Sequence, residues 1–178
     1  EAALARLPPG GQLWDLGCGS GIIGLTVALE RPDAAVRASD ISPDALAVAQ
    51  ANAAALGASI EWAQGSWFAA QPAAEGLFDI IASNPPYIEA GDEHLQQGDL
   101  RFEPAAALTD FADGLSHIRT LAAQAQGYLK PGGWLLLEHG WNQGEAVRGI
   151  LAEHGWQQVA TLRDLAGLDR VSIGRKAV

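Results

Sequence analysis

Short apolar runs alternate with longer amphipathic stretches along this chain, and this pattern predicts strands and helices in turn. The apolar runs have the length of buried strands and cover residues 12–16, 35–39, 60–63, 78–83 and 134–138. The amphipathic stretches have the length and spacing of helices and cover residues 22–30, 115–129 and 144–154. Such alternation indicates an α/β domain with a mostly parallel sheet and helices on both of its faces.

Local signals add a further helix and an edge hairpin. Ser42 is a typical N-cap, Pro43 suits the first helical position, and Gly57 suits the residue after the helix end, so we predict a helix between them. The last two apolar runs, at residues 158–163 and 170–174, predict an antiparallel hairpin at the edge of the sheet.

One long segment, residues 88–113, has little periodicity and contains Pro104 and several acidic residues. A loop of this length in a compact domain is usually functional or disordered. Because it directly follows the Asn-Pro-Pro-Tyr sequence at residues 84–87, we expect a loop that faces the substrate.

Composition narrows the class of protein. The chain has 178 residues, enough for one domain, and 48% of them are hydrophobic. The net charge of -10 argues against a direct nucleic-acid partner or an anionic membrane surface. A single cysteine excludes an intrachain disulfide, and no stretch has the length of a membrane-spanning helix. We therefore expect a cytoplasmic monomer.

The first residues suggest a longer protein. The chain contains no methionine and begins with a short helical pattern, EAALARL. We expect residues 1–12 to be the end of a linker or helix that follows an N-terminal domain, and residues 13–178 to form the domain described above.

A glycine turn joins the first predicted strand to the following helix. Gly17, Gly19 and Gly21 allow a tight turn and a close approach of a ligand to the backbone, with Cys18 and Ser20 between them. Asp40 ends the next strand about 20 residues later, where an acid can bind ribose hydroxyls. The order of strand, turn, helix, strand and acid predicts a cofactor that carries a nucleoside, rather than a turn with only a structural role.

The glycine pattern does not by itself identify the cofactor. Residues 19–24 also match the dinucleotide pattern G-x-G-x-x-G, so a nicotinamide enzyme remains an alternative. For Cys18, a small side chain in the turn is favoured over a reactive thiol. Trp67 follows the third strand, where it either contacts the adenine of the cofactor or covers the hydrophobic core.

The tetrapeptide Asn84-Pro85-Pro86-Tyr87, here called the Asn-Pro-Pro-Tyr motif, ends the fourth predicted strand. An amide or amino nitrogen is a poor nucleophile, and the Asn84 side-chain oxygen and the Pro85 carbonyl oxygen can accept hydrogen bonds from both of its hydrogens. The prolines fix the backbone, and Tyr87 can pack against the planar group. Positioning of this kind can supply most of the rate acceleration.

The motif and the glycine turn together predict transfer of a methyl group from S-adenosylmethionine to nitrogen. Asn84, Pro85 and Tyr87 are the expected catalytic residues, and Pro86 completes the substrate contact. The structural alternative is a Pro-Pro turn in which Asn84 caps a strand. We predict no metal site, because no pair of the four histidines has the spacing of metal ligands with cysteine or carboxylate support.

These motifs resemble those of the peptide chain release factor glutamine N5-methyltransferases of the HemK type. The resemblance covers residues 13–175. The Asn-Pro-Pro-Tyr motif is shared with DNA adenine methyltransferases, whereas residues 94–104 (HLQQGDLRFEP) and 135–140 (LLLEHG), followed by Gln143-Gly144, are typical of the release factor family.

The resemblance implies a Rossmann-like class I S-adenosylmethionine-dependent fold and methylation of the glutamine in the Gly-Gly-Gln motif of bacterial class 1 release factors. It implies that the donor lies on the glycine turn, with Asp40 at the ribose, Trp67 beside the adenine and Asn84 between donor and substrate. The alternatives are a DNA or RNA amino methyltransferase, a domain that binds the donor without catalysis, and a nicotinamide oxidoreductase.

Overall fold

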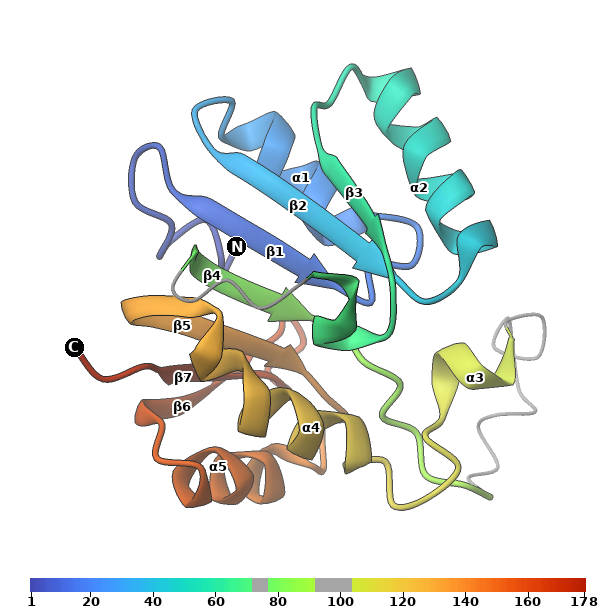
Figure 1. Ribbon diagram of the computed structural model, residues 1–178. Coiled ribbons are helices and arrows are strands. Elements are labelled where there is room, and N and C mark those ends of the chain that lie inside the picture. Colours follow the sequence, from blue (N-terminus) through green and yellow to red (C-terminus); the bar gives the residue numbers. More distant parts are fainter. Residues whose placement is uncertain (72–76, 92–103) are drawn as a thin grey trace.

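A seven-stranded sheet forms the middle layer of the molecule (Figure 1), and the computed structural model describes residues 1–71, 77–91 and 104–178. The strands are β1 (Gln12–Leu16), β2 (Ala35–Asp40), β3 (Glu61–Gln64), β4 (Phe78–Ser83), β5 (Leu129–Glu138), β6 (Gln157–Arg163) and β7 (Asp169–Arg175). They lie in the order β3-β2-β1-β4-β5-β7-β6. The first five pair in parallel, and β7 is antiparallel to both β5 and β6. The predicted parallel sheet and edge hairpin are confirmed.

Helices cover both faces of this sheet, as predicted (Figure 1). They are α1 (Ile22–Glu30), α2 (Pro43–Leu56), α3 (Ala105–Leu108), α4 (Ser116–Gln124) and α5 (Gly144–Glu153), with short 3-10 turns at Trp67–Ala70 and Ala125–Gly127. Helices α1 and α2 lie on one face, and α4 and α5 lie on the other.

The core has two layers because the central strands are buried on both faces. On β1, Leu13 packs with Val27 of α1, whereas Trp14 and Leu16 point to the opposite face and pack with a cluster that includes Leu121. Strands buried on both sides read as continuous apolar runs, which is why these strands were visible in the sequence.

The ends of α2 agree with the predicted signals. The Ser42 hydroxyl oxygen accepts a hydrogen bond from the Ala45 amide at 3.2 Å, and Pro43 is the first helical residue. Gly57 follows the helix with φ 70°, a left-handed conformation that glycine adopts at low cost.

The helix predicted over residues 115–129 is too long, and the strand predicted over 134–138 is too short. Helix α4 ends at Gln124, and β5 begins at Leu129. The reason is that the Tyr128 carbonyl accepts hydrogen bonds from the amides of Leu77 and Phe78 at the start of β4, so the chain leaves the helix earlier. The Pro-Gly-Gly sequence at residues 131–133 lies at an irregularity inside β5 rather than at a helix end.

The first residues pack against the domain. Ala3 and Leu7 are buried with Leu13 and Ile80, and Arg31 donates hydrogen bonds to the carbonyl of Leu7 at 2.8 Å and of Pro8 at 3.0 Å. The expected N-terminal domain remains a prediction.

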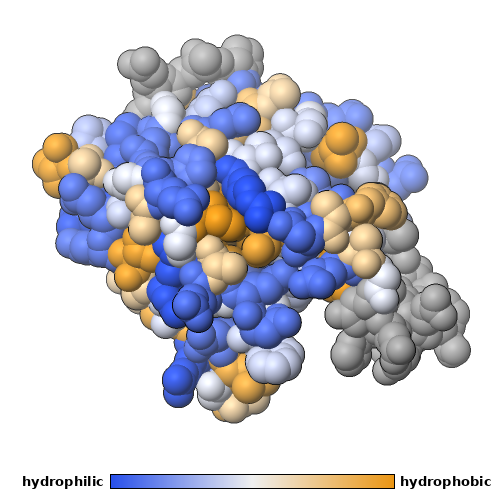
Figure 2. All heavy atoms as spheres, turned by 90° about the horizontal axis from the view of Figure 1, so that it is seen from below, coloured by the Kyte–Doolittle hydropathy of each residue, from blue (hydrophilic) through white to orange (hydrophobic). Residues whose placement is uncertain are grey.

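One face of the surface is mainly hydrophilic, and its apolar residues gather in small groups (Figure 2). Within the described ranges, no helix is long and apolar enough to cross a membrane.

Candidate active site

The predicted site residues lie where neighbouring parallel strands end. In the sheet register, Leu16 at the end of β1 pairs with Ser39 on one side and with Ser83 on the other. The Ser83 hydroxyl also donates a hydrogen bond to the Leu16 carbonyl at 2.7 Å. The glycine turn, Asp40 and Asn84 follow these three residues directly, so the structure brings them to one edge of the sheet. This is the edge where open α/β sheets bind ligands.

The glycine turn has the conformation that its sequence requires. Gly17, Gly19 and Gly21 have φ angles of 67°, 54° and 86°, all in the left-handed region. The amides of Gly17 and Cys18 donate to the Ser39 carbonyl at 2.9 and 3.0 Å, which holds the turn against β2. A Cβ atom at Gly19 would meet nothing within 4 Å among the described residues, so open space lies beside the backbone there.

Asp40 supports the turn and retains acceptor capacity. One carboxylate oxygen accepts a hydrogen bond from the Gly19 amide and the other from the Ser42 amide, both at 2.9 Å. A carboxylate has about four lone-pair sites, so these two bonds leave room for further donors such as ribose hydroxyls.

Asp15 is a second carboxylate, buried two residues before the turn. Its Oδ2 atom accepts a hydrogen bond from the Gly24 amide at 2.8 Å, whereas its Oδ1 atom is buried without a partner in the described part of the chain. Burial raises the pKa of Asp15 to about 7, against a smaller lowering by the Gly24 amide. An unpaired buried acceptor is costly and suits a bound donor or cation.

Trp67 lies against the glycine turn. Its indole ring is so close to Gly17 that a Cβ atom there would be 3.0 Å from the Trp67 Cζ3 atom. The backbone of Trp67 has φ 45°, an uncommon angle for a residue with a large side chain. The His117 ring of α4 packs against the Trp67 indole ring at a centroid distance of 5.2 Å. Trp67 therefore packs both on the glycine turn and on the hydrophobic core, and its contact with the adenine stays a prediction.

The Asn-Pro-Pro-Tyr motif follows β4 with Asn84 exposed and Pro85 buried. The half-buried Tyr87 lies within the electrostatic influence of Glu138 and Arg170, at the ends of β5 and β7 that meet beside the motif. Burial is the main cause that raises the pKa of Tyr87, followed by the charge of Glu138. The phenol is therefore neutral.

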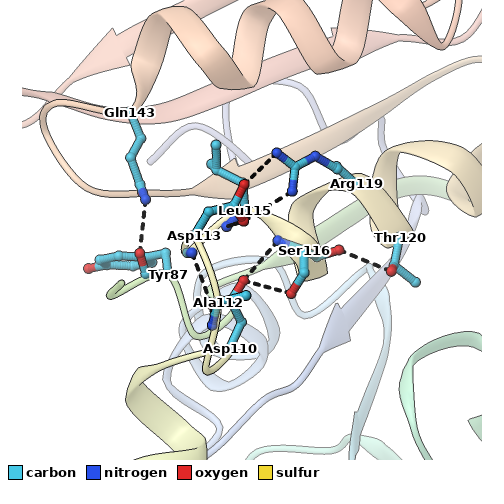
Figure 3. Close-up of polar contacts among 10 residues, drawn as sticks. Tyr87, Asp110, Ala112, Asp113, Leu115, Ser116, Arg119, Thr120 and Gln143 are labelled. Atoms are coloured by element: carbon cyan, nitrogen blue, oxygen red, sulfur yellow. Dashed lines mark hydrogen bonds and ion pairs between the residues drawn. The ribbon is translucent and has the colours of Figure 1, made fainter. Parts of the chain in front are cut away.

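A loop that precedes α4 lies beside the motif (Figure 3). The Ile88 amide donates to the Leu108 carbonyl at 2.9 Å, and the Ala90 amide donates to the Ala112 carbonyl at 3.0 Å. The Asp110 carboxylate organises this loop, because it accepts hydrogen bonds from the amides of Ala112, Gly114 and Ser116 and from the Ser116 hydroxyl, at 2.6–2.9 Å. These bonds hold the pKa of Asp110 at about 2 despite its partial burial.

The surroundings of Cys18 and His139 favour structural roles for both residues. Burial and the carboxylates of Asp15 and Asp40 raise the pKa of the Cys18 thiol to about 12, which agrees with a small side chain in the turn rather than a reactive thiolate. His139 is buried, and its Nε2 atom lies 2.8 Å from the Ser172 hydroxyl, so it joins β5 to β7. Burial lowers the pKa of His139.

Sequence analysis missed several contributors. His117 of α4 packs on Trp67, a contact that no signal in the sequence indicated. Asp110 and Gly114 carried no signal beyond a turn-like composition, and Gln143 was noted only as part of a family motif. Of the motif at residues 94–104, the part from His94 to Glu103 lies outside the described residues.

Comparisons with known proteins agree with this geometry. The sequence profile described as "Methyltransferase small domain" matches residues 2–110. The chain is 65% identical to the release factor glutamine methyltransferase of Neisseria gonorrhoeae and 51% identical to that of Xylella fastidiosa, in each case over 98% of this chain and 64% of the relative. The chain therefore spans slightly less than two thirds of the length of these two relatives.

The fold has solved counterparts. A methyltransferase from Pyrococcus furiosus superposes with a TM-score of 0.73 at 19% identity, over 99% of this chain and 80% of that one. At this identity the likeness shows the fold alone, a Rossmann-like methyltransferase fold. With the profile match over more than half of its residues, the chain belongs to the methyltransferase small domain family.

Proposed function

We propose that this chain transfers a methyl group from S-adenosylmethionine to the side-chain amide nitrogen of the glutamine in the Gly-Gly-Gln motif of bacterial class 1 release factors. One observation carries the proposal: exposed Asn84 follows β4 directly beside the glycine turn that follows β1, because Leu16 and Ser83 are register partners. A donor on the turn and an amide at Asn84 would then be neighbours. The identity of 65% to a release factor glutamine methyltransferase supports this substrate.

The residues present fit the proposed donor. The left-handed glycines leave open space beside Gly19, Asp40 retains acceptor sites, and Asp15 has a buried oxygen without a partner among the described residues. When bound, S-adenosylmethionine supplies an electrophilic methyl group on a sulfonium ion. Residues 17–21 and Asp40 would hold it, and the Trp67 ring would limit its position from the side of β3.

The motif orients the substrate nitrogen. The Asn84 side-chain oxygen and the Pro85 carbonyl oxygen accept the two amide hydrogens of the glutamine, which directs the nitrogen lone pair toward the methyl carbon. Tyr87 packs against the planar amide. A carbon–nitrogen bond forms as the carbon–sulfur bond breaks, and the nitrogen then loses one proton to water. This yields N5-methylglutamine and S-adenosylhomocysteine. Positioning and preorganised hydrogen bonds supply the acceleration.

The release factor is also the proposed partner, with the enzyme acting as a cytoplasmic monomer and without nucleic acid. The net charge of -10 supports a protein substrate over DNA or RNA. The Asn-Pro-Pro-Tyr motif alone does not distinguish these substrates, because amino methyltransferases that act on adenine share it.

A comparison of three substrates tests the proposal. Purified protein in its full natural length is given labelled S-adenosylmethionine with unmethylated release factor, with a release factor whose Gly-Gly-Gln glutamine is replaced by alanine, and with adenine-containing DNA. Label is expected on the first substrate only. Label found only on DNA would show that the substrate is a nucleic acid and not the release factor.

A further inference from the structure

Gln143 at the start of α5 connects the Asn-Pro-Pro-Tyr motif to the end of β5. Its side-chain amide nitrogen donates a hydrogen bond to the Tyr87 carbonyl at 2.9 Å (Figure 3), and its side-chain oxygen accepts one from the Gly140 amide at 2.8 Å. Gln143 as a residue is 7% exposed, and both bonds are partly buried. A buried amide with both ends paired holds a fixed orientation.

The same carbonyl has a second tight neighbour, Gly114. A Cβ atom at Gly114 would lie 2.3 Å from the Tyr87 oxygen and 2.8 Å from the Gln143 Nε2 atom, and Gly114 has φ 73°. The Gly114 amide is in turn bound to Asp110 at 2.9 Å. The Tyr87 carbonyl is therefore enclosed by the loop before α4 and by the start of α5.

The Tyr87 carbonyl belongs to the peptide group between Tyr87 and Ile88. Holding this carbonyl therefore fixes the orientation of the peptide plane at the end of the motif. Pro85 and Pro86 have restricted φ angles, so the remaining freedom of the segment lies mainly in its ψ angles and in the peptide after Tyr87. The bond from Gln143 therefore anchors the backbone of Tyr87 at the end of the motif.

We propose that Gln143 is a positioning residue, which sets the orientation of Pro85 and Tyr87 toward the substrate amide through the Tyr87 carbonyl. The inference rests on the proposed function. It predicts that loss of this one bond lowers the rate of methyl transfer while donor binding is unchanged, because the glycine turn is held by other contacts, those to Ser39 and Asp40.

The variant Gln143→Glu removes this bond and places a carboxylate beside the Tyr87 carbonyl, and Gly114→Ala below disturbs the same carbonyl without adding a charge. Glutamate keeps an oxygen to accept from Gly140 but, when ionised, offers no donor to the Tyr87 carbonyl. The matched control is Gln126→Glu, because Gln126 also donates from its side-chain amide to a backbone carbonyl, that of His154, at 2.8 Å. A second arm uses Gly114→Ala, with Gly167→Ala as its control, since Gly167 has φ 79° and open space around its Cα.

Turnover is measured with release factor and labelled donor, and each rate is divided by the number of donor-binding sites found by calorimetry. For Gln143→Glu and Gly114→Ala, kcat is expected to fall roughly 10- to 100-fold, as misplacement near the reacting atoms does. The donor Kd, the KM for release factor and the control variants are expected to change less than about threefold.

Two results would overturn the role of Gln143. One is a kcat for Gln143→Glu equal to that of Gln126→Glu. The other is a parallel loss of donor binding and turnover, which would indicate a general structural role. A wild-type protein that binds the donor but methylates no release factor would instead contradict the proposed function, and the inference would fall with it.

Discussion

At the residue scale, Asn84 is the side chain on which the proposed chemistry depends most. Replacement of Asn84 by alanine removes one of the two proposed acceptors for the amide hydrogens. We expect kcat to fall about 100- to 1,000-fold, the effect of removing one preorganised hydrogen bond at a reacting group. Steady-state kinetics with release factor measures the loss. Because Asn84 is exposed at a strand end, the melting temperature of the variant should match that of the wild type.

Gly17 gives a prediction about donor binding. Alanine at this position would carry a Cβ atom 3.0 Å from Trp67 in a backbone with φ 67°. We expect the Kd for S-adenosylmethionine to rise roughly tenfold, or about 1.4 kcal/mol, because Trp67 and the turn both shift. Calorimetric titration checks this.

The matched control is Gly10→Ala, which has a similar φ of 66° and no neighbour within 4 Å. It shares the cost of the left-handed backbone but has no contact with Trp67. If both variants bind the donor as the wild type does, Trp67 does not limit the donor site.

At the element scale, Asp110 holds the loop beside the Asn-Pro-Pro-Tyr motif through four hydrogen bonds. Asp110→Asn removes the charge and is expected to cost roughly 1–3 kcal/mol of unfolding free energy, together with a lower kcat. Asp33→Asn is the control, since Asp33 binds the Gly10 amide and Arg31 elsewhere in the fold. Asp33→Asn should lose stability but keep kcat.

The pH dependence of this loop has a definite sign. The pKa of Asp110 is lowered from 3.8 to about 2, so its contribution to stability is complete above about pH 4 and is lost as the pH falls toward 2. Denaturant titrations at several pH values should show the difference between wild type and Asp110→Asn shrinking over that interval. A difference that persists at about pH 2 would contradict this role for the carboxylate.

Much of the element structure could be predicted from the sequence. β1, β4 and α1 have the predicted bounds, because the two strands are buried apolar runs and α1 lies between the glycine turn and Pro32. The path from α4 to β5 could not be predicted. It depends on the pairing of Tyr128 with Leu77 and Phe78, residues about 50 positions away in the chain, as well as on local propensity.

In the candidate site, too, the residues with local sequence signatures could be predicted, and the contacts between distant elements could not. The glycine turn, Asp40 and the Asn-Pro-Pro-Tyr motif have local signatures, and the sheet register brings them together as expected. The contacts of Gln143 with Tyr87 and of His117 with Trp67 join residues from different elements. A single sequence contains no periodicity or spacing that indicates such pairs.

At the scale of the whole molecule, the buried Asp15 should impose a pH dependence on stability. Its pKa is raised to about 7, so the folded state holds a proton that the unfolded state has released, and stability decreases as the pH rises from about 4 to about 7. Asp15→Asn keeps a carbonyl oxygen for the Gly24 amide and removes this decrease.

Urea unfolding between about pH 5 and pH 8 checks this behaviour. The stability of Asp15→Asn relative to wild type should increase with pH and level off above about 7. Asp44→Asn, at the exposed first turn of α2, is the control. A relative stability of Asp15→Asn that is independent of pH would show that the buried carboxyl group does not titrate in this range.

The central claim is that the motif beside the glycine turn directs a methyl group to a glutamine amide. The most direct test is the mass of the Gly-Gly-Gln peptide of release factor after incubation with S-adenosylmethionine and either the wild-type protein or Asn84→Ala. The account predicts the added mass of one methyl group on the glutamine with the wild type and an unmodified peptide with the variant over the same time. An unmodified peptide in both reactions, with donor binding intact, would contradict it.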